Sequence, residues 1–90
     1  MDIKENILFI TGKLAENNLK KILESISEKN FIYEIENLNI NVAALLTTDM
    51  ISRRIGDISR FNRIIVPGKV RGDIKELSKK LGIKVERGPE

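Results

Sequence analysis

Two short segments hold the residues best suited to bind a negatively charged ligand. In the first, the apolar run that ends at Thr11 is followed by Gly12 and Lys13. In the second, the run that ends at Val66 is followed by Pro67, Gly68, Lys69, Val70, Arg71 and Gly72. Glycine permits a sharp backbone turn, lysine supplies a positive charge, and the planar guanidinium of arginine suits phosphate or carboxylate. If each turn leads into a helix, the free N–H groups of the first helical turn add to the attraction for an anion.

The same two segments also have an explanation without a ligand. Turns between a strand and a helix carry glycine for backbone reasons, and exposed lysines are common in a basic chain. At the second turn, Asp73 is placed to cap the following helix, where its carboxylate competes with an anion. The two segments therefore have two interpretations. They are either simple connections between a strand and a helix, or they form an anion site that consists of Gly12, Lys13, Gly68, Lys69, Arg71 and Gly72.

Composition limits the chemistry further. The chain has 90 residues and contains neither Cys nor His, which removes thiol chemistry, disulfides and the commonest general base and metal ligand. Neither turn has the glycine spacing of a P-loop or of a dinucleotide-binding loop. We therefore predict no catalytic residue, no metal site and no cofactor. An enzyme with Asp49 or Asp73 as its base ranks last, since a catalytic base should be sheltered and the sequence shelters neither.

Three other polar groups have simpler interpretations than a site. We attribute Thr47, Thr48 and Asp49 to solvent exposure or local helix capping. We attribute Glu34 and Glu36 to protection of a sheet edge. A basic patch is interpreted as a solvated face and not as a nucleic-acid surface, because only one aromatic residue, Phe61, lies near its members. The patch consists of Arg53, Arg54, Arg60 and Arg63.

Apolar spacing predicts strands that alternate with helices. A continuous apolar run predicts a buried strand at residues 7–11, and alternation predicts an edge strand at 31–36. Between them, the spacing of Leu19, Ile22, Leu23 and Ile26 predicts a helix that ends near Asn30. A second helix is expected from Val42 to Ile55, with Asn39 or Asn41 as its cap or with an irregular start at Thr47 and Thr48. Residues 63–66 form the third strand, a helix from Asp73 stops at Gly82, and residues 83–86 form the last strand.

This alternation predicts an α/β fold. We expect a three-layer α/β/α domain with a four-stranded parallel sheet in the order 2-1-3-4, which is similar to half of a Rossmann or flavodoxin-like fold. In that order the winding reverses between the first and third strands, and open sheets of this class bind ligands in the crevice at that point. Both glycine-lysine turns follow those two strands.

Charge and hydropathy indicate the surroundings of the protein. The formal net charge of +3 favours anions mildly, but acidic residues are spread along the whole chain, so nucleic acid is not an expected partner. The N-terminal residues do not have the pattern of a signal peptide, and no apolar run is long enough to cross a membrane. We expect a cytoplasmic protein with no membrane partner.

Four segments of the chain carry a resemblance to a known family. They are residues 7–16, 42–48, 66–73 and 85–89, of which Thr-Gly-Lys-Leu-Ala-Glu, Ala-Ala-Leu-Leu-Thr-Thr and Pro-Gly-x-x-Arg-Gly-Asp are the most specific. This order resembles the N-terminal region of the dihydropteroate synthase-related proteins of archaea and some methylotrophic bacteria. The resemblance implies that residues 1–90 are one α/β domain, the N-terminal part of a longer protein. A pterin-binding-like TIM barrel would follow it and be its partner, in C1 metabolism of the tetrahydromethanopterin type. The resemblance assigns no chemical role to any residue of this chain.

The sequence supports two functions of different classes. The first is a non-catalytic accessory domain that binds an anionic, phosphorylated small molecule at the two turns. The second is a docking or dimerisation module for the barrel, with no ligand of its own.

Overall fold

The computed structural model describes residues 5–26, 31–38, 40 and 46–88 of the chain. Strands and helices alternate along these residues. The strands are β1 (Glu5–Thr11), β2 (Phe31–Asn37), β3 (Arg63–Val66) and β4 (Lys84–Arg87). The helices are α1 (Glu16–Ser25), α2 (Thr48–Arg54) and α3 (Ile74–Leu81).

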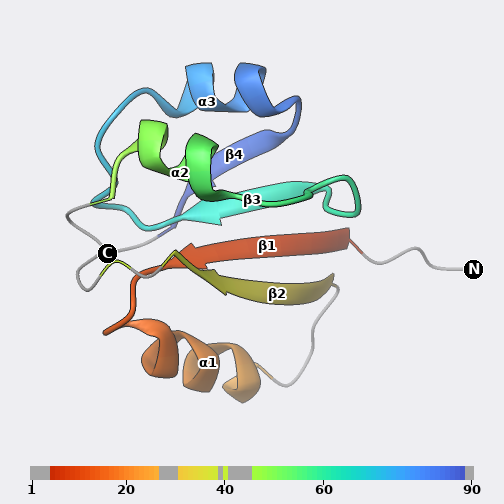
Figure 1. The fold of residues 1–90 in the computed structure, drawn as a ribbon. Helices are drawn as coiled ribbons and strands as arrows, with labels where there is room; N and C mark the ends of the chain where they lie inside the picture. Colours follow the sequence, from red (N-terminus) through yellow and green to blue (C-terminus); the bar gives the residue numbers. More distant parts are fainter. Residues whose placement is uncertain (1–4, 27–30, 39, 41–45, 89–90) are drawn as a thin grey trace, which may run out of the picture.

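The sheet has the predicted topology. Its four strands are all parallel and lie in the order β2-β1-β3-β4. Helix α1 lies against one face of the sheet, and α2 and α3 lie against the other (Figure 1). The three-layer α/β/α architecture is therefore confirmed.

The larger part of the core lies on the side of α2 and α3. Leu8 is the register partner of Ile64, which in turn pairs with Val85, so these three side chains project from the same face of the sheet. They are buried in one cluster with Ile51 of α2 and Leu77 of α3. This cluster holds β1 and β3 together and so fixes the positions of the turns that follow them.

The last helix has the boundaries that the sequence indicates. The Asp73 side chain caps α3 by accepting hydrogen bonds from the backbone N–H groups of Lys75 and Glu76. Gly82 ends the helix in the left-handed conformation, with φ of 69°. Strand β4 begins one residue later than predicted because the Ile83 N–H donates to the Ser78 carbonyl and so completes the end of α3.

Helix α1 is shorter than predicted. It ends at Ser25, and Ile26 has an extended backbone with φ of −75° and ψ of 111°, so a helix that continues to Asn30 is wrong. Leu23 is the buried member of the predicted apolar face, whereas Ile22 is 61% exposed. The helix lies under the β2 side of the sheet (Figure 1), which gives its apolar face less surface to cover than a central helix would have.

Of the two predicted starts of helix α2, the irregular start at Thr47 and Thr48 is confirmed, because the helix begins at Thr48. Thr47 is extended and caps the helix by accepting a hydrogen bond from the Met50 N–H, so a helix that already includes Leu46 and Thr47 is wrong. The backbone of Thr47 forms a parallel bridge with Arg71, and this pairing keeps it out of the helix. The suggested caps Asn39 and Asn41, and residues 42–45, lie outside the described residues.

Candidate anion-binding edge of the sheet

Both glycine-lysine turns emerge at the same edge of the sheet. Strands β1 and β3 are parallel neighbours, and their arrowheads point the same way in Figure 1. Neighbouring strands lie about 4.8 Å apart, so the backbone leaves β1 and β3 at adjacent places. We call this region the carboxyl edge; it comprises Gly12 and Lys13 after β1 and residues 67–72 after β3.

The first turn holds its lysine at the surface. Gly12 is buried, whereas Lys13 is exposed. The Lys13 N–H donates to the Ile40 carbonyl over 2.6 Å, and the Leu38 N–H donates to the Thr11 carbonyl over 3.4 Å. Within the described residues, the Lys13 ammonium has no hydrogen-bond or ion-pair partner.

The second turn presents two cations around a buried anchor. The Val70 side chain is buried, and its N–H donates to the Pro67 carbonyl. The Arg71 backbone is fixed from both sides, since its N–H donates to the Leu46 carbonyl and its carbonyl accepts from the Thr48 N–H. The side chains of Lys69 and Arg71 are exposed, and neither has a partner among the residues that the structure describes.

Gly72 is required by the shape of the second turn. Its φ is 119°, which side chains rarely adopt, and a Cβ atom there would lie 2.2 Å from the Thr48 Oγ1 atom. Gly72 therefore allows the turn to pass closely over the start of α2. Gly68 is partly buried and has no positive φ.

Arg87, at the end of β4, also belongs to the carboxyl edge, although it is absent from the residues predicted for the anion site. Its Nη1 atom donates to the carbonyls of Gly68 and Val70, and its Nη2 atom donates to the carbonyl of Gly72 over 3.0 Å. The only sequence signal is the position of Arg87 at the end of the last strand. Its target lies 15 to 19 residues away, so the contact follows from the sheet register and not from local spacing.

The helices that follow the two turns differ. At α3 the first amides are occupied by Asp73, so the expectation of free N–H groups there is wrong. At α1 no side chain caps the first turn, and Ala15 precedes the helix. The two turns are therefore not the same structural device.

Apolar residues fill the space beneath the carboxyl edge. Leu38 and Leu46 are buried in the core cluster, and Ile40 packs against that cluster. The backbone of Leu38 bonds to the end of β1, whereas the backbones of Ile40 and Leu46 bond to the first and the second turn. Two hollows of about 230 and 200 Å³ are lined by residues of other regions, one beside Glu34, Glu36 and Phe61 and one between α2 and α3. A ligand of the carboxyl edge would thus bind on its surface.

The arginines of the basic patch are engaged within the protein. Arg53 pairs with Asp49 at 2.9 Å, and Arg54 donates to the Leu38 carbonyl. Arg63 pairs with Glu5 at 2.8 Å and with Glu86 at 3.1 Å, both on neighbouring strands. These partners offset the positive charge of the arginines, which would be needed to bind the phosphate backbone of a nucleic acid.

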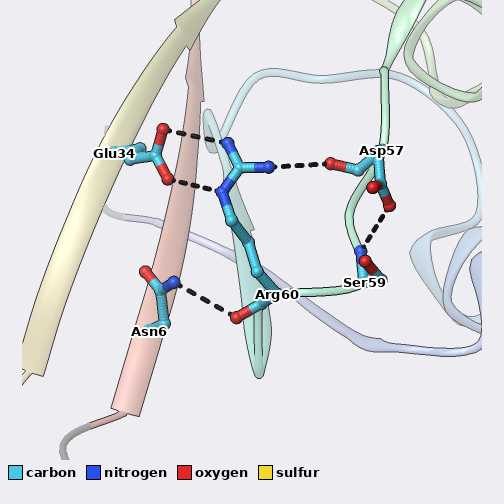
Figure 2. A network of polar contacts seen from close by, with 5 residues as sticks. All are labelled: Asn6, Glu34, Asp57, Ser59 and Arg60. Atoms are coloured by element: carbon cyan, nitrogen blue, oxygen red, sulfur yellow. Dashed lines mark hydrogen bonds and ion pairs between the residues drawn. The ribbon is translucent and has the colours of Figure 1, made fainter.

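The remaining arginine of the patch is held in the network shown in Figure 2. Arg60 binds both carboxylate oxygens of Glu34, at 2.8 and 2.9 Å, and its Cζ atom lies 4.4 Å from the centre of the Phe61 ring. The hydrogen bond from Arg60 lowers the pKa of the Glu34 carboxyl below its ordinary value. Asp57 accepts from the Ser59 N–H, which lowers the pKa of Asp57. Glu34 therefore fixes a loop to the edge strand β2.

The two aspartates considered as bases have structural partners. Asp49 forms the ion pair with Arg53, and Asp73 caps α3. The capping interpretation of Thr47 is confirmed by its hydrogen bond to Met50. Among the described residues, no group of three or more acidic side chains is close enough to hold a metal ion. None of the described helices combines the length and hydrophobicity needed to cross a bilayer.

Comparisons with known proteins identify relatives of this chain. The model of a family described as "Family of unknown function (DUF6513)" matches residues 5–90. The uncharacterized protein MJ0107 of Methanocaldococcus jannaschii is 33% identical over an alignment of 87 residues, and the match covers 87% of this chain. The chain spans 16% of the length of that relative. No solved structure matches the chain.

Proposed function

This chain belongs to the DUF6513 family, and we propose that it is a non-catalytic accessory domain whose carboxyl edge binds an anionic, phosphorylated ligand. The ligand would contact Lys13, Lys69 and Arg71, while Gly12, Gly68 and Gly72 shape the two turns. Binding would take place on an exposed surface, so we expect an affinity in the millimolar range for inorganic phosphate, about −4 kcal/mol.

The observation that carries this proposal is a difference between two sets of cations. The guanidinium groups of Arg53, Arg54, Arg60, Arg63 and Arg87 all contact carboxylates or backbone carbonyls. In contrast, the side chains of Lys13, Lys69 and Arg71 at the carboxyl edge have no hydrogen-bond or ion-pair partner within the described residues. Three unpaired cations at one edge, with the fork of Arg71 among them, favour a ligand with several anionic oxygens.

A longer parent protein is part of the proposal. The chain corresponds to only 16% of its relative from M. jannaschii, which supports the view that it works as one domain of a larger protein. The sequence resemblance suggests a dihydropteroate synthase-related parent, and a pterin phosphate is then the ligand to test. A cytoplasmic location is also proposed, since the sequence has no Cys and so needs no oxidising compartment.

Titration followed by NMR tests the ligand proposal directly. Inorganic phosphate, pyrophosphate and a pterin phosphate are added to the labelled 90-residue chain, and the backbone amides of residues 12–13 and 68–72 are followed. We expect these amides to shift together, with pyrophosphate binding more tightly than phosphate because it carries more charge. Arg71→Gln and Lys69→Gln should each weaken binding. Lys79→Gln, which removes an exposed charge from α3, is the matched control.

The result that overturns the proposal is equally clear. If the amides of both turns stay in place at millimolar pyrophosphate, the carboxyl edge is not an anion site. If Lys79→Gln weakens binding as much as Arg71→Gln, the effect is one of net charge and the edge has no special role.

Exposed apolar side chains favour docking as a second candidate function. Ile22 on α1 is 61% exposed, and Leu14 before α1 is exposed as well. Docking to the rest of the longer protein would cover such residues. Sedimentation of the chain with the separately produced remainder distinguishes the two functions. Docking predicts a complex that survives the Lys69 and Arg71 substitutions and is lost with Ile22→Lys.

A further inference from the structure

We propose that Arg87 is a positioning residue that holds the second turn in its anion-binding shape. This inference rests on the proposed function, because it concerns the same site. Arg87 is the last residue of β4 and the register partner of Val66, the last residue of β3. Its side chain therefore starts beside the point at which the chain enters the turn.

The guanidinium of Arg87 donates hydrogen bonds to three backbone carbonyls of the second turn. Two of its nitrogen atoms donate to the carbonyls of Gly68, Val70 and Gly72, which alternate along the loop. Arginine presents several N–H donors in one rigid plane, so a single side chain can fix all three carbonyls at once. Lysine carries the same charge but has no planar fork.

Fixing these carbonyls favours an anion in two ways. A carbonyl oxygen carries partial negative charge and repels phosphate, and its hydrogen bond to a guanidinium offsets that charge. The contacts also order the loop before a ligand arrives, so less conformational entropy is lost on binding. Lys69 and Arg71 lie between the three contacted residues and are presented outward by the same loop.

The first turn does not depend on Arg87. Its backbone is held through the Ile40 carbonyl, which accepts from the Lys13 N–H. A substitution at Arg87 should therefore act on one half of the edge only. This asymmetry separates positioning from a general loss of charge or of folding.

The test measures phosphate binding at each turn separately. Amide shifts of Lys69 and Gly72 report the second turn, and those of Gly12 and Lys13 report the first, in the wild type, Arg87→Gln, Arg87→Lys and Lys84→Gln. Lys84→Gln is the matched control, because it removes one positive charge from the same strand at an exposed side chain whose ion pair is with Glu86. Thermal melts and amide spectra establish that each variant is folded.

In Arg87→Gln we expect the Kd reported by the second turn to rise about fivefold, or about 1 kcal/mol, which is the net contribution of one ordinary hydrogen bond. The Kd reported by the first turn should change no more than in Lys84→Gln. Arg87→Lys should fall between the wild type and Arg87→Gln, since it keeps the charge and loses the fork.

The outcomes separate this inference from the proposed function. If the wild type binds phosphate and Arg87→Gln binds it like Lys84→Gln, the positioning role is wrong and the anion site stands. An equal loss at both turns also overturns the positioning role. If the wild type does not bind phosphate or pyrophosphate, the proposed function fails and the positioning role fails with it. If Arg87→Gln does not fold, Arg87→Lys decides the question by the same comparison.

Discussion

At the scale of single residues, the described glycines differ in what a side chain would meet. Gly72 combines a φ of 119° with a close approach to Thr48, Gly82 has a φ of 69° and open space, and Gly56 has open space without a positive φ. Substitution by alanine should therefore cost most at Gly72, about 2 to 3 kcal/mol of unfolding free energy, and about 1 kcal/mol at Gly82. At Gly56 it should be neutral or stabilising, because alanine restricts the unfolded chain. Urea unfolding measures all three, and equal costs at Gly72 and Gly56 would contradict the geometry.

A second residue-scale prediction concerns the ion pair of Glu34 with Arg60. The hydrogen bond from Arg60 lowers the pKa of Glu34 in the folded protein, so the pair stabilises the fold above the ordinary carboxyl pKa and is lost as the pH falls through the lowered value. Glu34→Gln should therefore lower the melting temperature at pH 7, and the difference should shrink as the pH falls through the lowered pKa of Glu34, because the carboxyl then becomes protonated in the folded state as well. Glu36→Gln, on the same face of β2, should have the smaller effect at pH 7. A deficit of Glu34→Gln that persists in acid would assign the stabilisation to packing instead of charge.

At the scale of elements, the N-terminus of α3 links stability to the proposed site. Asp73 caps the helix and also places a carboxylate next to Gly72 at the carboxyl edge. Asp73→Ala removes the cap and should cost about 1 kcal/mol of unfolding free energy. Asp73→Asn keeps a good capping residue and removes the negative charge, so stability should stay nearly constant while the Kd for phosphate falls. Urea unfolding and NMR titration of both variants test this. Weaker phosphate binding by Asp73→Asn would place the ligand elsewhere.

Element boundaries that depend on neighbouring residues in the sequence, such as a cap, a glycine or a proline, could be predicted. Boundaries and side-chain contacts that depend on residues distant in the sequence could not. The bounds of β3 were correct because the apolar run lies between Arg63 and Pro67, and α3 lies between its Asp73 cap and Gly82. The start of α2 stayed open between Val42 and an irregular turn at Thr47 and Thr48, because the pairing of the Thr47 backbone with Arg71 that decides it is a distant contact. The contact of Arg87 with the second turn depends on the β3–β4 register, and that of Arg60 with Glu34 spans 26 residues. Hydrophobic spacing contains no information on either.

At the scale of the whole molecule, the two faces of the sheet are unequally packed. The main buried cluster joins β1, β3 and β4 to α2 and α3, and it includes Leu77. Helix α1 contributes Leu23, which lies outside that cluster, and it leaves Ile22 exposed. The face under α1 also contains a group of mutually contacting rings formed by Phe9, Phe31 and Tyr33. We infer that α1 is the least stable layer of the domain and that β1 and β3, with the turns that follow them, belong to its most stable part.

Two leucines with the same burial provide the test of this inference. Leu23 and Leu77 are each 3% exposed, so a difference between their alanine variants reflects the surrounding packing and not the exposure of the side chain. Leu77→Ala should cost about 3 to 5 kcal/mol of global unfolding free energy, whereas Leu23→Ala should cost about 2 kcal/mol or less. Hydrogen exchange should show that the amides of α1 open at a lower free energy than those of β1 and β3, and that Leu23→Ala lowers this opening energy further. Equal costs for the two variants, or equal protection of α1 and β1, would mean that the layers unfold as one unit.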